Sequence, residues 1–375
     1  MDLGEIRKEI DSIDAQLIEL FKKRMQCSIA VAEYKKETNT PIMNLKREQE
    51  ILDKVEKQGG EFGYAAQLLF SNILELSRGL QHDIIGSGKE IRNLINNAKS
   101  FINKDKTVKI ALQGIKGANS HEATTRLFPE CEPVFYKSFA QVFEAVNNGE
   151  ATYGVLPVEN SSAGSVADVY DLILKYRFYI VKALDLPIDH CLCSLKQSEL
   201  SDIEQVWSHP QALAQCTDFI DKNNYTTVPS PNTAIAAQDI AKEKRLNCGA
   251  ICTKKASEEY GLKVLVEKCQ NEKDNSTRFI VISKELIIPS DADKISLCFS
   301  LPHIKGSLYN VLGRFSSNGM NLTKIESRPM DGASFEYLFY LDFQGSVHSE
   351  KVMNMLCALS EEMPEFSFLG NYKES

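Results

Sequence analysis

The chain has 375 residues and a formal net charge of −8, and 43% of its residues are hydrophobic. This balance is typical of a folded protein of two or three domains, and the acidic excess argues against nucleic acid as a partner. No apolar run approaches the length of a membrane span, and the start of the chain lacks the apolar segment of a secretory signal. We therefore expect a cytoplasmic protein with no membrane partner.

The first segment carries apolar residues at helical spacing, with neither glycine nor proline between Glu5 and Thr40. This pattern predicts one helix of roughly 55 Å, which is longer than the remaining helices of one protomer can cover. Two further helices are predicted at about Leu45 to Lys57 and Tyr64 to His82. We expect an all-helical domain over residues 1–86, with its long helix covered by a second copy of the chain.

Polar residues interrupt this apolar pattern, and helical geometry brings several of them to shared faces. At about 100° per residue, Arg24 and Lys35 lie within about 20° of each other, whereas Arg7 lies about 100° away. Inward-pointing lone charges are costly, so a bound anion is their natural partner. A solvated bundle surface is the alternative for any one of them alone. The full set comprises Arg7, Arg24, Lys35, Asn44, Arg47, Glu48, Ser77 and Gln81.

This set resembles the pattern of the all-helical chorismate mutases, over roughly residues 1–85. The resemblance implies an intertwined dimer in which Arg7 serves the partner's pocket, and it departs from some members at Asn44. Chorismate rearranges to prephenate without proton transfer, so only orientation and charge stabilisation accelerate the reaction. Arginines suit the two carboxylates, and Lys35 and Gln81 are expected to donate to the ether oxygen. Glu48 would accept from the ring hydroxyl.

After a polar stretch expected to be a linker (87–106), apolar runs alternate with helical patterns, which predicts an α/β domain. Val108–Leu112 is predicted to be a strand, with Ser120 capping the helix that follows. Similar helix starts occur at three further places. The first carries Asn160 and Ser161, the second carries His209, and the third carries Thr233. Free N–H groups at helix starts suit carboxylates, although ordinary capping uses the same residues. There is no nucleotide-binding or metal-ligand signature, so we expect no cofactor and no metal.

These motifs and the run from Asn275 to Phe279 resemble prephenate dehydratase over residues 107–285. The resemblance implies two α/β lobes, like those of a periplasmic-type binding protein, with the active site between them. Prephenate loses CO₂ and its ring hydroxyl, and Thr277 is the expected donor to the leaving oxygen. His209 is an alternative acid, or only a cap. The expected substrate-binding residues are Ser120, Asn160, Ser161, Thr233 and Arg278, of which Arg278 has a structural role as its alternative.

The last segment, over residues 294–372, has a pattern of strand, helix, strand, strand, helix, strand, which predicts a ferredoxin-like order. Strands are expected at Ile295–Leu301 and Glu336–Phe343, and helices at Ser307–Phe315 and Glu350–Met363. Two of its motifs resemble an ACT regulatory domain, which implies L-phenylalanine as effector between paired domains. A plain dimerisation domain is the alternative. The motif residues are Gly306, Ser307, Leu308, Glu326, Ser327, Arg328 and Pro329.

Together these segments predict a homo-oligomer, dimeric or higher, that belongs to phenylalanine biosynthesis. It would convert chorismate to prephenate and then to phenylpyruvate, under inhibition by L-phenylalanine. A non-catalytic two-lobed anion-binding protein with an amino-acid-sensing tail is the alternative from another class, and a middle domain that prefers arogenate is the enzymatic alternative. The ten cysteines are interpreted as reduced core thiols rather than as a metal or redox site.

Overall fold

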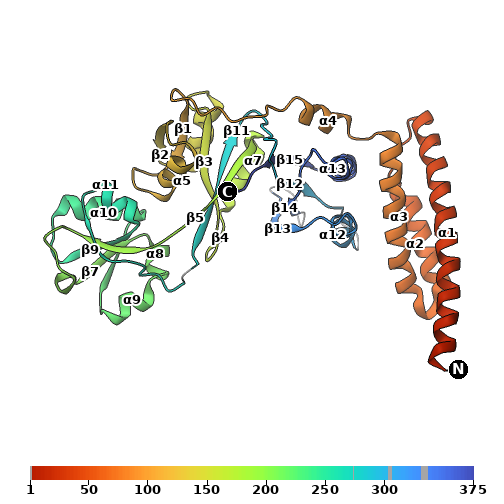
Figure 1. The fold of residues 1–375 in the computed structure, drawn as a ribbon, viewed down its shortest axis with the longest axis horizontal. Helices are drawn as coiled ribbons and strands as arrows, with labels where there is room; N and C mark the ends of the chain where they lie inside the picture. Colours follow the sequence, from red (N-terminus) through yellow and green to blue (C-terminus); the bar gives the residue numbers. More distant parts are fainter. Residues whose placement is uncertain (1, 273, 303–305, 331–336) are drawn as a thin grey trace. The chain divides into compact units, whose positions relative to one another are not determined.

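The computed structural model describes residues 2–272, 274–302, 306–330 and 337–375 (Figure 1). The chain forms two compact units, one of Met1–Asn97 with Ile295–Phe368 and one of Ala98–Lys294 with Leu369–Ser375. The helical segment and most of the last segment, which lie at opposite ends of the sequence, therefore belong to one unit. Within the described residues, no helix has the length and apolar character needed to cross a membrane.

The first unit opens with the helices α1 (Leu3–Thr38), α2 (Leu45–Gly59), α3 (Gly63–Ile85) and α4 (Lys89–Asn96), and a short 3₁₀ turn, η1 (Gly60–Phe62). A capping box starts α1, because the Asp2 side chain accepts from backbone N–H groups of the first turn while Glu5 accepts from Asp2. Both α1 and α2 pack on α3. The three predicted helices are confirmed, whereas α4 forms where the sequence predicted a linker.

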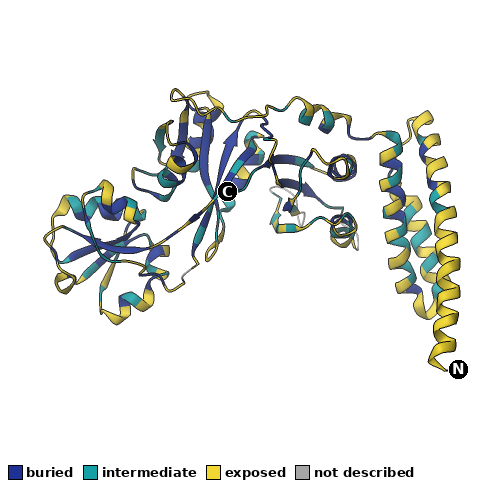
Figure 2. Ribbon diagram, in the orientation of Figure 1, coloured by how far each residue is buried: buried dark blue, intermediate teal, exposed yellow. Residues whose placement is uncertain are grey.

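The N-terminal half of α1 presents an uncovered apolar face, seen as exposed ribbon in Figure 2. Of the whole helix, only Ser28 and Ala32 are buried. The apolar residues Ile6, Ile10, Ile13, Leu17 and Leu20 are between 40% and 62% exposed. A contiguous apolar face of this size marks a surface that another protein covers.

The C-terminal segment of the chain contains α12 (Ser307–Ser317), α13 (Glu350–Glu362) and a sheet of strand order β13-β14-β12-β15, of which residues 294 and 369–372 are grouped with the second unit. Its strands are β12 (Lys294–Ser300), β13 (Leu322–Pro329), β14 (Tyr337–Gln344) and β15 (Ser367–Tyr372). This order confirms the ferredoxin-like prediction. Glu336, the expected first residue of one strand, lies outside the described residues. Helix α3 packs against α12 and α13, and α4 packs against α13.

The second unit contains two lobes, each built on its own sheet. In the first lobe the strand order is β2-β1-β3-β11-β5, and β4 pairs with β3. The strands β1, β2 and β3 are parallel, whereas β11 runs antiparallel to both of its neighbours. The elements are β1 (Lys109–Gln113), α5 (Asn119–Leu127), β2 (Glu132–Tyr136), α6 (Phe139–Asn147), β3 (Tyr153–Asn160), β4 (Gly164–Ser165), α7 (Ala167–Tyr176), β5 (Tyr179–Pro187) and β11 (Ser276–Ser283).

The second lobe has the strand order β10-β6-β9-β7-β8. Its elements are β6 (Cys191–Ser194), η2 (Leu200–Asp202), β7 (Gln205–Ser208), α8 (Pro210–Ala214), α9 (Thr217–Lys222), β8 (Thr226–Pro229), α10 (Thr233–Glu243), β9 (Cys248–Cys252), α11 (Lys254–Glu259) and β10 (Lys263–Val266). Each lobe has a buried apolar cluster, and a cluster of the second lobe also includes Ala118 from the first. The chain crosses between the lobes before β6 and again before β11, so the expected two-lobed α/β domain is confirmed.

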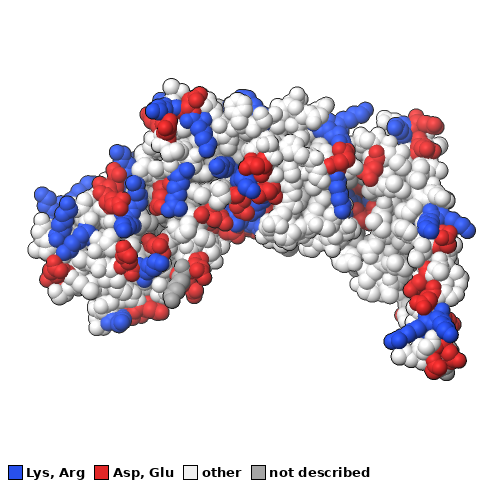
Figure 3. Space-filling model, in the orientation of Figure 1, with Lys and Arg blue, Asp and Glu red and all other residues white. Residues whose placement is uncertain are grey.

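The surface carries charges of both signs. Figure 3 shows Lys and Arg side chains interspersed with Asp and Glu over the face in view. Such mixing is typical of the surface of a globular protein. The cysteines behave differently, because nine of the ten are buried and all ten are free thiols. Their burial fits the interpretation of cysteine as a small core residue.

Candidate active sites

A cavity of about 320 Å³ lies among the first three helices, and we call it the helical cavity. It is lined from all three helices, so residues far apart in the sequence meet there. Seven of the eight residues expected from the sequence line it. They are Arg24, Lys35, Asn44, Arg47, Glu48, Ser77 and Gln81.

Arg24 is held by the facing helix α3. Its Nη1 donates to Ser77 Oγ at 2.7 Å, and Ser28 Oγ lies 3.1 Å from the same hydroxyl. Burial lowers the pKa of the Arg24 guanidinium, and the nearby Cys27 opposes that shift. A guanidinium that has lost part of its hydration gains more from an incoming carboxylate than one in bulk water does.

Lys35 lies one turn before the end of α1, and its Nζ donates to the backbone carbonyl of Ile42. Burial lowers the pKa of this ammonium, Glu48 opposes that effect, and Arg78 adds to it. The direction of the shift shows that the ammonium is partly desolvated and would be stabilised by a further negative charge.

The two residues at the start of α2 differ in what they do. Asn44 is the N-cap of this helix, since its Oδ1 accepts from Arg47 N at 3.0 Å. The Arg47 side chain is exposed, and its Nη1 lies 3.1 Å from Glu50. An exposed pair of this kind contributes at most about 1 kcal/mol, so Arg47 is readily released to bind an anion.

Gln81 occupies the buried end of the helical cavity. Its Nε2 donates to the Ser77 carbonyl at 3.2 Å. In the part of the chain that the structure describes, its buried Oε1 has no hydrogen-bond partner. The amide nitrogen carries two hydrogens, so one remains available for a ligand oxygen after the bond to the Ser77 carbonyl, while the unpaired Oε1 is suited to accept from a ligand hydroxyl.

Arg7 is the one expected residue that the structure does not bring to the helical cavity. It lies seventeen positions before Arg24 on the same continuous helix, a distance of about 25 Å along the axis. No rotamer of arginine spans that length. Any contribution from Arg7 must therefore be made to a different chain.

A second cavity, of about 390 Å³, lies between the two lobes of the second unit, and we call it the interlobe cavity. Its lining comes from strand ends and helix starts in both lobes. Among the described residues that line it, two histidines are the only ones with titratable side chains. The lining residues used below are Asn119, Ser120, Asn160, His190, His209, Gln215, Asn232, Thr233, Asn275 and Thr277.

Thr277 stands in this lining at the start of β11, and only 9% of it is exposed. Its Oγ1 accepts from Asn160 Nδ2 at 3.0 Å. The same amide donates to Asn275 Oδ1 at 2.9 Å and to the Ser276 carbonyl at 3.0 Å. Because the Thr277 oxygen accepts from Asn160, its own hydrogen remains available to be donated.

The starts of α5 and α10 reach the interlobe cavity. Ser120 lies in the first turn of α5 but is not its cap, because the helix already begins at Asn119 with Ala118 in the cap position. The sequence placed this cap two residues too late. Asn232 caps α10 through Ile235 N at 2.7 Å, which puts Thr233 at the first helical position.

His209 caps the short helix α8, since its Nδ1 accepts from Gln211 N at 3.2 Å. The capping alternative for this residue is therefore confirmed. Its Nδ1 is engaged in the cap, although the ring still forms part of the cavity lining.

Arg278 and Ser161 are not among the lining residues, which differs from what the sequence suggested. Side chains alternate along a strand, so Thr277 and Phe279 face the cavity while Arg278 points from the other side of β11. Arg278 lies near Asp185, Glu159 and Glu374, and these carboxylates raise its pKa against the effect of burial. The Ser161 hydroxyl accepts from Ser276 N at 3.0 Å and so fixes β11. The ion pairs of Arg278 are what its structural alternative would require.

His190 and Gln215 are polar lining residues to which the sequence analysis assigned no role. His190 Nε2 lies 2.9 Å from Gln215 Oε1, and Gln215 Nε2 donates to Ser162 Oγ at 2.6 Å. Burial lowers the pKa of His190, and its hydrogen bond to Gln215 opposes the shift. No pattern in the sequence marked Gln215, which connects the two lobes through its hydrogen bonds to His190 and Ser162.

The residues of the expected effector motifs lie in the C-terminal part of the first unit. Gly306 is the N-cap of α12 with φ of 82°, a conformation that favours glycine. Ser307 Oγ donates to the Pro302 carbonyl at 2.7 Å. The second motif, from Glu326 to Pro329, lies on β13, where exposed and half-buried residues alternate.

Family models match this chain in two places. One for type II chorismate mutase covers residues 6–82, and one for prephenate dehydratase covers residues 110–286. The helical cavity lies within the first match and the interlobe cavity within the second. Fold and sites thus define a two-part enzyme, an isomerase joined to a lyase.

Full-length relatives carry the same two parts. A bifunctional chorismate mutase/prephenate dehydratase of Aquifex aeolicus is 31% identical over 377 residues, which covers 100% of this chain and 98% of the relative. The arogenate dehydratase/prephenate dehydratase 1 of Arabidopsis thaliana is 37% identical over 74% of this chain and 75% of its own length. A solved prephenate dehydratase from Arthrobacter aurescens, in complex with L-Phe, is 31% identical over 71% of this chain and 89% of its own, with a TM-score of 0.65.

The chain belongs to the bifunctional chorismate mutase/prephenate dehydratase family. It is an enzyme that rearranges chorismate to prephenate and then converts prephenate to phenylpyruvate by loss of CO₂ and water.

Proposed function

We propose that the helical cavity is where chorismate rearranges. Arg24 and Arg47 bind the two carboxylates, Lys35 and Gln81 donate to the ether oxygen, and Glu48 accepts from the ring hydroxyl. Ser77 orients Arg24, and Asn44 shapes the site by capping α2. The observation that carries this proposal is the convergence of these residues on one cavity from three helices.

The helical site is completed by Arg7 of a second copy of the chain, in a dimer built on α1. The uncovered apolar face of α1 supports this arrangement, as does the distance of about 25 Å along the helix axis between Arg7 and the cavity of its own chain. Burying that face against a second copy would remove these apolar side chains from water, as homodimer interfaces do. Dimers or higher oligomers of this kind would share their mutase sites between protomers.

The interlobe cavity is where prephenate loses CO₂ and water, with Thr277 as the donor to the departing hydroxyl. Asn160 supports this role because its amide orients the Thr277 oxygen and stabilises developing negative charge on it. Backbone N–H groups near Ser120 and Thr233, at the starts of α5 and α10, are suited to the substrate carboxylates. Ser161 and Arg278 act from outside the cavity, by fixing β11.

The C-terminal segment, at residues 294–372, is an ACT regulatory domain that binds L-phenylalanine and inhibits the enzyme. Its ferredoxin-like strand order supports this assignment, and so does the L-Phe complex of the Arthrobacter relative. Residues Gly306–Leu308 and Glu326–Pro329 would contact the amino acid. The catalytic domains are residues 1–86 and 107–285. Inhibition requires the amino acid to bind a less active arrangement more tightly than the active one.

Substrate preference in the interlobe cavity is the point on which the relatives differ, because the Arabidopsis protein is named for arogenate as well as prephenate. We take prephenate as the substrate, since the mutase part of the same chain produces it. Purified protein supplied with chorismate should release prephenate and then phenylpyruvate. With arogenate as substrate, the same protein should form phenylalanine with a kcat/KM less than about a tenth of its kcat/KM for prephenate. A tenfold ratio corresponds to about 1.4 kcal/mol in activation free energy. Equal rates would overturn the preference.

A further inference from the structure

One buried arginine joins the helical cavity to the C-terminal segment of the same unit. Arg78, on α3, lines the helical cavity next to Ser77, and its side chain is only 8% exposed. Neither the sequence pattern nor the roles assigned above use this residue. Each nitrogen of its guanidinium lies against a different carboxylate.

The three carboxylates come from three elements. Arg78 Nη1 donates to Glu48 on α2, and Nη2 donates to Glu75 on its own helix. Its Nε lies 3.3 Å from Glu362 Oε2, at the end of α13. Two of its nitrogens therefore donate hydrogen bonds, and the third lies near a carboxylate without donating one to it in the described residues. Two hydrogen bonds to different carboxylates are enough to orient a planar guanidinium.

The C-terminal segment fixes the far side of this network. Arg314, on α12, pairs with both Glu75 and Glu362. His82 Nε2 lies 2.7 Å from Glu362 Oε1, and His82 Nδ1 lies 2.8 Å from Ser87 Oγ. The Glu362 side chain is 1% exposed, so burial would raise its pKa, but His82, Arg314 and Arg78 hold it at about 2. A buried carboxylate with these partners is an anchor rather than a surface contact.

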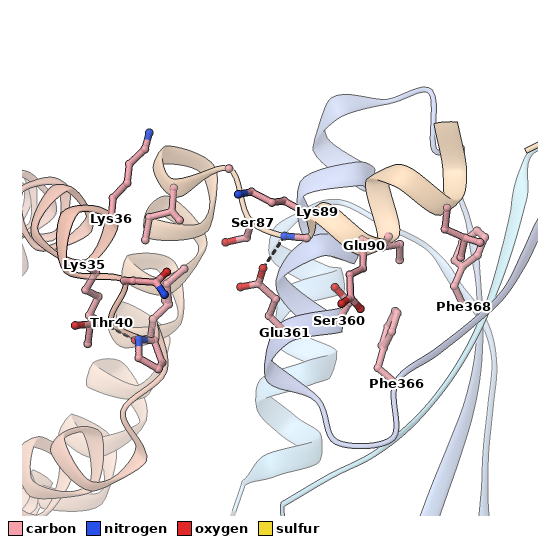
Figure 4. A pocket seen from close by; sticks show the side chains of 18 residues that line it. Lys35, Lys36, Thr40, Ser87, Lys89, Glu90, Ser360, Glu361, Phe366 and Phe368 are labelled. Atoms are coloured by element: carbon pink, nitrogen blue, oxygen red, sulfur yellow. Dashed lines mark hydrogen bonds between the residues drawn. The ribbon is translucent and has the colours of Figure 1, made fainter. Parts of the chain in front are cut away.

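A second approach of the C-terminal segment toward the catalytic residues is seen at a neighbouring cavity of about 1020 Å³ (Figure 4). Lys35 and Ile42 line both this cavity and the helical cavity. Across from Lys35, Figure 4 shows Ser360 and Glu361 of α13, with the Glu361 carboxylate accepting from Gly88 N at 2.6 Å. The end of α13 therefore borders the catalytic helices through two adjacent glutamates, of which only Glu362 reaches Arg78.

We propose that Arg78 is a positioning residue of the mutase site, which holds the Glu48 carboxylate toward the substrate. Glu362 of the C-terminal segment lies against Arg78 and is itself paired with Arg314. This inference rests on the assignment of the helical cavity as the mutase site. Lys35 is half-buried and lines the same cavity as Glu48, and the Glu48 carboxylate already acts on the pKa of Lys35. Without Arg78, Glu48 would pair with Lys35, and two substrate ligands would be lost together.

The test is a double-mutant cycle on kcat/KM for chorismate in the full-length enzyme. Arg78→Met should lower this value about tenfold to a hundredfold, the range expected for loss of a charge-assisted contact. Arg78→Lys, which keeps the charge, should recover part of the loss. In the Glu48→Gln background, Arg78→Met should change the value by less than about twofold, because its action passes through Glu48.

A matched pair tests the anchor on α13. Glu362→Gln should lower mutase kcat/KM about threefold to tenfold, whereas Glu361→Gln, one residue away, should leave it within about twofold. Dehydratase activity of the same preparations should stay within about twofold for both variants, which reports the folding of the rest of the chain. If Arg78→Met does not fold, the variants Glu362→Gln and Glu361→Gln, each made with and without Glu48→Gln, test the positioning role instead. The effect of Glu362→Gln on mutase kcat/KM should then disappear in the Glu48→Gln background.

Two results would overturn the inference, and they are distinguishable. Additive effects of Arg78→Met and Glu48→Gln would show that Arg78 acts by stabilising the fold and not through Glu48. An unchanged mutase rate in Glu48→Gln alone would remove the helical cavity as the mutase site, and the positioning role would fall with it.

Discussion

The hydroxyl of Thr277 is the most informative single group to remove from the dehydratase site. Thr277→Val keeps the branched shape of the side chain and removes only the oxygen, while Thr277→Ser keeps the oxygen and removes a methyl group. If this hydroxyl donates to the leaving oxygen, valine should lower kcat for prephenate by about 10² to 10⁴, the usual contribution of a positioned proton donor. Serine should retain activity within about tenfold.

The structure indicates that valine should cost little stability. Asn160 Nδ2 loses one acceptor but keeps Asn275 Oδ1 at 2.9 Å and the Ser276 carbonyl at 3.0 Å. No buried donor is left unpaired, so the loss should be on the order of 1 kcal/mol. The rate effect therefore greatly exceeds the expected effect on folding.

The assay follows phenylpyruvate formation from prephenate and, in the same preparation, prephenate formation from chorismate. Mutase activity within about twofold of wild type serves as the control for folding. A valine variant that kept half or more of the wild-type kcat for prephenate would refute the donor role of Thr277. Loss of both activities together would refute the separation of the two sites.

Four further outcomes are expected. Arg24→Ala should abolish prephenate formation from chorismate and leave phenylpyruvate formation from prephenate intact; equal loss of both would contradict separate sites. Leu17→Asp, on the uncovered face of α1, should lower the molar mass seen by light scattering and the mutase rate; an unchanged mass would argue against a dimer built on α1. L-phenylalanine should release or absorb heat on titration, with weaker binding to Ser327→Ala and Arg328→Ala; no heat from wild type would exclude the effector role. Glu362 has a pKa depressed to about 2 from 4.5, so its stabilisation, roughly 3 kcal/mol, is present above about pH 4.5 and lost as pH falls through 2. The unfolding-midpoint difference between wild type and Glu362→Gln should shrink on acidification, and a constant difference would contradict this.

Sequence patterns predicted the elements and shared faces that depend on interactions between residues near one another in the chain. The long helix was predicted because nothing between Glu5 and Thr40 interrupts it, and the structure confirms it as Leu3–Thr38. Helical spacing also predicted that Arg24 and Lys35 share a face, and both line one cavity. The cap of α5 was placed at Ser120 because serine is a frequent cap, but tertiary packing starts that helix at Asn119.

The contacts of residues whose partners are distant in sequence could not be predicted from periodicity and spacing. Arg278 follows Thr277 directly, and only the orientation of β11 shows that the two side chains face opposite sides. Gln215 acquires a role because the fold of the two lobes brings it to Ser162 and His190. No periodicity in the sequence reports these distances.

The sequence by itself determined the division of the chain into helical, α/β and ferredoxin-like segments. It also indicated the polar residues that line the helical cavity. Both follow from periodicity and spacing, which are properties of residues near one another in the sequence. Only the tertiary structure decided that Arg78 meets Glu362, which lies 284 positions later, and that Met1–Asn97 and Ile295–Phe368 form one compact unit. Buried ion pairs of this kind depend on which helices pack together, and packing is a property of the whole chain.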